Sequence, residues 1–195
     1  ALLALLSSVM WGSADYVAGK LSRRRHVLVV LGGTQFVGLL AMLMTATLTG
    51  AWGAPLDYLG WAVLASLSGA TGLALYYRAL AIGTMGVVSP IAALGVLVPL
   101  TAGLAQGEQP APLQVAGIVL ALVGVIAASG PEVHGEAGWA PVLLAGGAAV
   151  FLGTSLLAIA RGSEYSTIMT MTVMRAVTVS VLVVLALATR HRVSI

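Results

Sequence analysis

The sequence predicts an all-α polytopic membrane protein, in which a bundle of helices crosses the lipid bilayer. Its 195 residues are 59% hydrophobic and 8% charged, whereas soluble domains carry about 25% charged residues. The chain holds only 9 Lys or Arg and 6 Asp or Glu, too few charged groups to cover a soluble domain of this size. This composition excludes a soluble enzyme, a nucleic-acid-binding protein and a disordered chain.

The spacing of the charges is the second observation that predicts membrane crossings. Asp, Glu, Lys and Arg are absent from residues 26–56, 58–77, 79–107, 109–131, 137–160 and 176–189. A helix needs about 20 mostly apolar residues to span the hydrocarbon core, and most of these stretches have room for one such helix. The strands of a β-barrel would alternate apolar and polar residues, but runs such as 118–128 do not alternate. The crossings are therefore predicted to be helices.

The first three crossings are predicted over residues 2–19, 27–48 and 58–80. The first ends at a basic connector, which contains Lys20, Arg23, Arg24 and Arg25. The third carries Ala65, Gly69 and Gly72 on the helix face of Tyr76. Because small residues let helix backbones approach closely, a neighbouring helix is expected on that face.

The last four crossings are predicted over residues 87–106, 113–129, 139–160 and 167–188. The first of these four is expected to be the most distorted, because Pro99 lies in its middle and frees a backbone carbonyl. Pro90 is tolerated in the first helical turn, where Ser89 is expected to act as the N-terminal cap. Seven helices in all are thus predicted, joined by short connectors.

The basic residues lie unevenly about these crossings. Seven Lys or Arg fall on the side of the first connector and one, Arg161, falls on the other side. Lys and Arg are enriched in cytoplasmic loops. The charge count taken alone therefore places the first connector inside the cell and the start of the first helix outside.

Several short strings occur together in this chain. They are Trp11-Gly12, the run from Tyr76 to Ala81, Val87-Val88-Ser89-Pro90, Gly107-Glu108, and then Gln114 and Gly117. In this order and spacing the sequence resembles the EamA-type transporters of the drug/metabolite transporter superfamily. The segment from Tyr76 to Gly117 is the most specific part of the resemblance.

The resemblance implies a protein of ten helices in two inverted five-helix repeats. Residues 1–130 then correspond to the first repeat and residues 131–195 to the first two helices of a second one. On this reading the chain is truncated after the seventh helix and belongs to a bacterial cytoplasmic (inner) membrane. The resemblance also implies a cytoplasmic amino terminus, which is opposite to the orientation that the charge count gives.

Asp15 and Arg175 are charged residues that lie well inside predicted crossings, and such residues are functional candidates because burying them in lipid is costly. Arg175 would cost about 2.5–3.5 kcal/mol at the bilayer centre, so it should face the bundle or a wet cavity. Its alternative role is structural, with the guanidinium bonded to backbone carbonyls. Asp15 has three functional interpretations: it takes a coupling proton, binds a cationic group or pairs with Arg175. The alternative is an interfacial carboxylate.

Three further residues complete the predicted substrate pathway. Trp11 shares the small and polar stripe of Asp15 on the first helix. Gln35 lies in the middle of the second helix, where a polar side chain either lines a pathway or bonds a neighbouring helix. Tyr76 either lines the path or belongs to an interfacial aromatic belt. The predicted pathway residues are therefore Trp11, Asp15, Gln35, Tyr76 and Arg175.

The function that the resemblance implies is secondary transport of small metabolites or drugs by alternating access between the two repeats. The sequence has no HExxH zinc motif and no Gly-rich phosphate loop that opens a helix. We therefore expect no enzymatic activity, cofactor or metal site, and transport driven by ion or solute gradients. The alternative is a membrane scaffold or assembly subunit without transport, and a homodimer is left open in either case.

Overall fold

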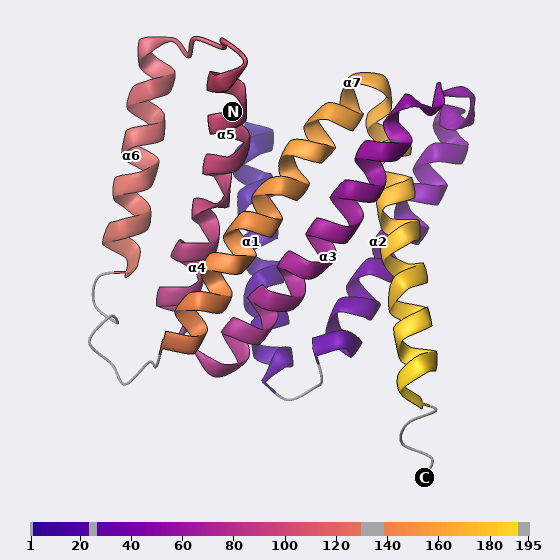
Figure 1. The fold of residues 1–195 in the computed structure, drawn as a ribbon, viewed down its shortest axis with the longest axis horizontal. Helices are drawn as coiled ribbons and strands as arrows, with labels where there is room; N and C mark the ends of the chain where they lie inside the picture. Colours follow the sequence, from indigo (N-terminus) through magenta and orange to yellow (C-terminus); the bar gives the residue numbers. More distant parts are fainter. Residues whose placement is uncertain (1, 24–26, 130–138, 191–195) are drawn as a thin grey trace.

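The computed structural model describes residues 2–23, 27–129 and 139–190, and within these ranges it contains helices and no strand. The α-helices run along the chain in this order: α1 (Leu2–Ser22), α2 (Val27–Thr49), α3 (Leu59–Ile82), α4 (Met85–Ala93), α5 (Leu97–Ala105), α6 (Pro112–Ser129) and α7 (Trp139–Arg190). Three short 3₁₀ helices join them: η1 (Ala51–Gly53), η2 (Leu56–Tyr58) and η3 (Leu94–Val96). The predicted all-α fold class is confirmed (Figure 1).

The long helix α7 consists of two arms. Ser166 has φ −163° and ψ 107°, which is not helical backbone, and at this point the chain turns back on itself (Figure 1). Its hydroxyl accepts a hydrogen bond from the backbone N–H of Met169, at 3.3 Å. Ser166 therefore caps the second arm, as serine commonly does at a helix start. We call residues 139–165 the first arm and residues 167–190 the second arm.

Each predicted crossing is helical in the structure. The fourth is a broken rod made of α4, η3 and α5, and its predicted distortion is confirmed by the 3₁₀ turn that Pro99 follows. The prediction that Ser89 caps this rod is wrong, because α4 begins at Met85 and its N-cap is Thr84. Pro90 consequently lies inside the helix, and the side chain of Ser89 is available for another partner.

Four helical segments of the described chain are long and apolar enough to span a membrane. They are Val29–Thr49, Leu56–Ile82, Met85–Ala105 and Trp139–Val184, the last of which contains both arms of α7. The apolar stretch Pro112–Val125 of α6 is shorter. Helix α1 has 21 residues but includes Asp15 and Lys20, and it is not among these segments. The structure is thus a polytopic membrane bundle.

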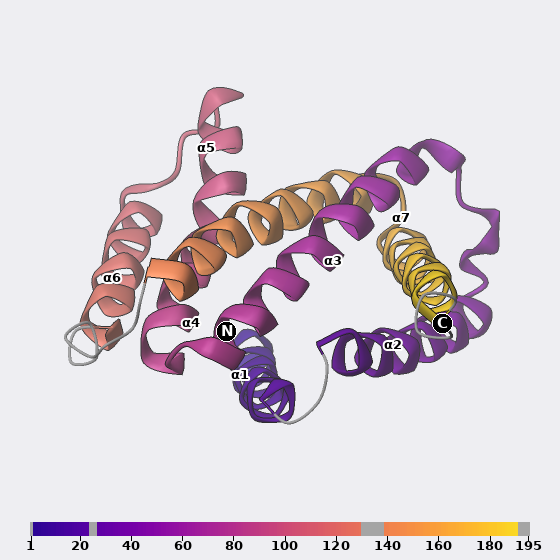
Figure 2. The same cartoon turned by 60° about the horizontal axis from the view of Figure 1, so that its bottom comes forward.

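Helix α3 lies at the centre of the bundle and packs along the first arm of α7 (Figure 2). A Cβ atom at Gly72 would lie 2.9 Å from the backbone nitrogen of Leu152, and one at Gly69 would lie 2.8 Å from Oγ of Ser155. The close approach predicted on this face of α3 is therefore confirmed, and its partner is α7. Helix α6 lies at one edge of the bundle, and α2 with the second arm lies at the other (Figure 2).

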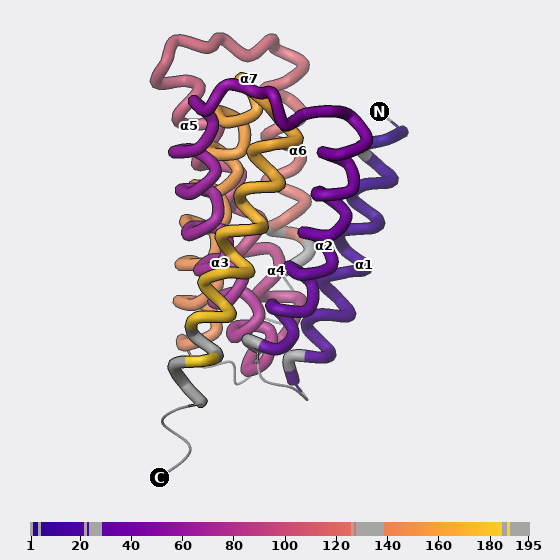
Figure 3. The backbone as a smooth tube through the Cα atoms, turned by 90° about the vertical axis from the view of Figure 1, so that its right-hand side faces the viewer, coloured from indigo at the N-terminus to yellow at the C-terminus, as the bar shows by residue number. Residues whose placement is uncertain are grey.

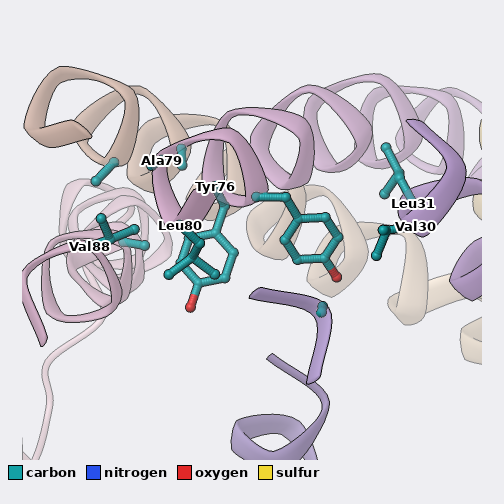
Figure 4. Close-up of a cluster of buried hydrophobic side chains, with 11 residues drawn as sticks. Val30, Leu31, Tyr76, Ala79, Leu80 and Val88 are labelled. Carbon is teal, nitrogen blue, oxygen red and sulfur yellow. The ribbon is translucent and has the colours of Figure 1, made fainter. Parts of the chain in front are cut away.

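Most of the buried apolar side chains gather in one cluster near the carboxyl end of α3. Figure 4 shows Tyr76, Ala79 and Leu80 of α3 between Val88 on one side and Val30 and Leu31 of α2 on the other. A second, smaller cluster lies at the opposite end of α3, and it contains Ala46, Tyr58, Ala62 and Met169. The middle of α3, between these clusters, faces the cavity described below.

The helices run roughly along one direction (Figure 3), and they alternate in sense along the chain. Helix α1 runs downward in Figure 1 from the N-terminus, whereas the first arm of α7 runs upward. The lower ends of α1 and α3 are joined where Arg23 donates a hydrogen bond to the backbone carbonyl of Gly83, at 2.7 Å. The basic residues Lys20, Arg23 and Arg78 thus belong to one end of the bundle. Arg24, Arg25 and the connector 130–138 lie outside the described residues.

Candidate functional site

A cavity of about 540 Å³ lies among α1, α2, α3, the broken rod of α4 and η3, and both arms of α7. Its apolar wall is made of small and aliphatic residues such as Ala65, Leu73, Met85, Leu152 and Ile159. The side chains with polar atoms in the lining are Trp11, Asp15, Gln35, Ser66, Tyr76, Ser89, Ser155, Arg175 and Thr178. Ligand sites are commonly apolar with a few convergent polar groups, and this cavity has that composition.

All five predicted pathway residues line this cavity. They come from α1, α2, α3 and the second arm of α7, which are far apart in the sequence. Trp11 lies at its edge, since 64% of the residue is exposed, whereas Tyr76 is 4% exposed and Gln35 is 7% exposed. The aromatic-belt interpretation of Tyr76 is therefore wrong, because the side chain is buried inside the protein.

The first polar group in the cavity joins three helices through Tyr76. Its hydroxyl donates to Oδ2 of Asp15 on α1, at 3.3 Å, and lies 2.9 Å from Oγ of Ser89 on α4. Because the phenol has one proton and donates it to the carboxylate, Ser89 is the donor in the second bond. We call Asp15, Tyr76 and Ser89 the tyrosine cluster. Asp15 is thus hydrogen-bonded to the neighbouring helix α3.

The second polar group joins α2 to the second arm of α7. Nη1 of Arg175 donates a hydrogen bond to Oε1 of Gln35, at 2.8 Å. The guanidinium lies against the backbone of α2, since a Cβ atom at Gly38 would be 2.6 Å from Nη1. Among the described residues the hydrogen bond of Arg175 goes to the Gln35 side chain and not to a backbone carbonyl. A structural role stays the alternative to a functional one.

The ion pair between Asp15 and Arg175, one of the predicted interpretations, is also wrong. Among the described residues the structure has one ion pair, between Arg161 and Glu164 near the turn of α7, at 3.1 Å. Asp15 and Arg175 line the same cavity but each is hydrogen-bonded to an uncharged partner. Asp15 and Arg175 are on separate helices, so their positions in the sequence did not determine which side chains they would contact.

Besides Ser89, three more hydroxyl groups in the cavity were not among the predicted site residues. Ser66 on α3 and Thr178 on the second arm share a hydrogen bond of 2.8 Å, and both are buried. Ser155 on the first arm donates to the backbone carbonyl of Ala65, at 2.8 Å. The sequence signal that could have identified these residues is a hydroxyl side chain within an otherwise apolar helix. That signal is weak, because many such hydroxyls bond their own helix, as Thr154 does with the carbonyl of Val150.

Metal ligands do not gather anywhere in the part of the chain that the structure describes, where no group of three His, Cys, Asp or Glu occurs. The histidines His26, His134 and His191, which the sequence places in connectors and the tail, lie outside the described residues. The chemistry of the cavity therefore rests on one carboxylate, one guanidinium, an amide and several hydroxyls.

Fold and cavity together define a helical membrane protein whose helices surround a small-molecule-sized space. The chain belongs to the EamA-like transporter family, whose model matches residues 1–130 of the 195. This match confirms the family that the sequence resembles, and it makes the protein one of a family of transporters. Neither the curated proteins nor the solved structures include a match to this chain.

Proposed function

We propose that this protein is part of a secondary transporter that moves small metabolites or drugs across the membrane through the cavity. The observation that carries the proposal is the convergence of Trp11, Asp15, Gln35, Tyr76 and Arg175 on one space of about 540 Å³. A cavity of roughly 300–1,000 Å³ is usual for a small ligand. Ionisable residues inside a membrane bundle usually mark a substrate or ion pathway.

Alternating access between two repeats is the mechanism we favour. The opposite directions of α1 and of the first arm of α7 support it (Figure 1), because an inverted repeat makes corresponding helices run in opposite senses. On this proposal, residues 1–130 form the first repeat and residues 131–195 begin the second. The tyrosine cluster, which ties α1 to α3 and α4 through side chains alone, is the contact we expect to open and close.

The test is transport by the full-length protein reconstituted in liposomes. Vesicles are loaded with a mixture of small metabolites, and their exchange with the outside is followed by mass spectrometry. We expect solute movement that Arg175→Ala and Asp15→Asn reduce. Arg161→Ala is the matched control, because Arg161 pairs with Glu164 outside the cavity, and it should leave the movement unchanged.

A scaffold without transport is the alternative, and water access to the cavity separates the two functions. The chain contains no cysteine, so single cysteines in place of Ser155 and Thr178 can be labelled with a charged, water-soluble thiol reagent. Labelling of both positions in the membrane supports transport. Protection of both positions, together with no solute movement, would contradict the proposed function and favour the scaffold.

Proton coupling at Asp15 stays a prediction within this proposal. Its carboxylate is held by the Tyr76 hydroxyl, at 3.3 Å, in the same cavity as the proposed substrate. If Asp15 carries the coupled proton, a pH gradient across the liposome drives solute uphill in the parent protein, and Asp15→Asn retains only downhill exchange. Uphill movement by Asp15→Asn would contradict coupling at this residue.

A further inference from the structure

The guanidinium of Arg175 is held in place by two features of α2. Its Nη1 donates to Oε1 of Gln35, at 2.8 Å, and Gln35 itself is buried. One turn along the same face, Gly38 leaves the space that the guanidinium fills, since a Cβ atom there would lie within 2.9 Å of Nη1, Cζ and Nε. The plane of the group is therefore set by the backbone and by one side chain of α2.

Most N–H donors of the Arg175 guanidinium have no hydrogen-bond partner among the described residues. A guanidinium has five N–H donors, and among the described residues Arg175 has one hydrogen bond, to Gln35. No carboxylate of the described residues lies within ion-pairing distance of it, because the ion pair found there joins Arg161 to Glu164. Within the part of the chain that the structure describes, Arg175 thus brings to the wall of the cavity a positive charge with no ion-pair partner and donors with no hydrogen-bond partner.

The identity of residue 35 preserves that charge. A glutamine accepts the hydrogen bond that orients the guanidinium but adds no negative charge, whereas a glutamate of the same size would neutralise it. The lining also contains the apolar side chains Leu73, Met85, Leu152 and Met174, and the tyrosine cluster, with the carboxylate of Asp15, contributes to the same cavity. The arrangement is that of one positive group on α7 and one carboxylate on α1, which form no ion pair with each other, in a pocket with a largely apolar wall.

We infer that Arg175, positioned by Gln35 and Gly38, is the binding point for a negative group of the substrate, so that the cavity takes small organic anions with an apolar body. The inference deepens the proposed function and rests on it. The anionic group is a carboxylate or a phosphate, both of which accept paired hydrogen bonds from a guanidinium. Gln35 is a positioning residue, since it acts through Arg175.

The test is equilibrium binding to the purified protein, which needs no transport. The probes are 3-phenylpropionate, 3-phenylpropionamide and 3-phenylpropylammonium, which share one apolar body and differ in charge, and phenyl phosphate as the phosphate arm. Trp11 at the cavity edge is the fluorescent reporter, in a protein in which Trp52, Trp61 and Trp139 are replaced by Phe. We expect 3-phenylpropionate or phenyl phosphate to bind about tenfold or more tightly than the amide. The tighter of the two anions identifies the group.

Variants of Arg175 and Gln35 test whether Arg175 causes the preference for the anionic probes. Arg175→Gln and Gln35→Glu should each abolish the preference for the anion, and Arg175→Lys should retain part of it, because it keeps the charge without the planar fork. Arg161→Gln is the matched control and should bind like the parent. If Arg175→Gln fails to fold, Gln35→Glu, which is nearly the same size, still provides the test.

Three results would overturn the inference. They are equal or tighter binding of the amide or the ammonium probe, an anion preference that survives Gln35→Glu, and no binding of either anion. These outcomes are distinct from failure of the proposed function. A protein that binds the anion through Arg175 but moves no solute in liposomes would contradict the proposed function alone.

Discussion

The contact of α3 with the first arm of α7 and its contact with α1 form two walls of the same cavity, and they are held by different means. Against α7, the backbones approach until a Cβ atom at Gly72 would lie 2.9 Å from the backbone nitrogen of Leu152. Against α1, the contact rests on side chains, with Tyr76 bonded to Asp15 and Leu80 lying beside Gly19. The close backbone contact between α3 and α7 allows few other arrangements of the two helices. The hydrogen bonds between side chains of α1 and α3 can break and form again.

The comparison indicates that the two walls have different roles. We expect the wall between α3 and α7 to determine stability and the wall between α1 and α3 to determine transport. The three predictions below test that difference, and the largest expected effect comes first.

Gly72→Ala should lower the free energy of unfolding by about 2 kcal/mol, because the new methyl group meets the backbone of α7, which cannot move aside cheaply. Unfolding in detergent, followed by circular dichroism, measures the change. Gly117→Ala in α6 is the matched control, since a Cβ atom there meets nothing within 4 Å. Equal stability of the two variants would show that the α3 and α7 backbones are not in close contact.

Ser155→Ala should lower the free energy of unfolding by about 1 kcal/mol, because it removes the hydrogen bond to Ala65 and leaves that carbonyl without its interhelical partner. The neighbouring Thr154→Ala removes a hydroxyl that bonds its own helix and should leave stability nearly unchanged. The same unfolding measurement applies to both. A larger loss for Thr154→Ala than for Ser155→Ala would contradict the assignment of stability to this wall.

Tyr76→Phe should lower the free energy of unfolding by about 1 kcal/mol, because it removes two hydrogen bonds between membrane helices, to Asp15 and to Ser89, of about 0.5 kcal/mol each. The same change should slow solute movement in liposomes by about fivefold, near the lower end of usual coupling energies, because it disconnects α1 from α3 and α4. Tyr77→Phe is the control, since the described residues include no hydrogen-bond partner for its hydroxyl. Unchanged transport by Tyr76→Phe would remove the distinction between the walls.

The positions of the helices could be predicted from the sequence because charge is so costly in lipid. Asp57 lies in the short helix η2 before α3, Glu108 lies between α5 and α6, and Arg161 lies near the end of the first arm of α7, so each is close to an end that the charge-free runs predicted. The same cost drew attention to Asp15 and Arg175, and both line the cavity. The free-energy cost of placing a charged side chain in lipid depends on single residues, so its effect on helix positions can be predicted from the sequence alone.

The partners of those residues could not be predicted, because they depend on how separate helices are rotated against one another. The helical period places Asp15 and Arg175 on faces of their own helices, but it does not say which neighbour each face meets. Asp15 meets Tyr76, and Arg175 meets Gln35. Ser89 was assigned to a helix cap for a similar reason, since local spacing did not reveal that Tyr76 would be its partner.

The hydrogen bond between Gln35 and Arg175 also has a consequence for the order in which the helices are synthesised and inserted into the membrane. The two residues are 140 positions apart, and synthesis begins at the amino terminus. Helix α2 therefore leaves the ribosome, and its amide is in place, well before the second arm of α7 arrives with its guanidinium. A side chain that is costly to move into the bilayer thus enters after the helix that carries its hydrogen-bond acceptor has been made.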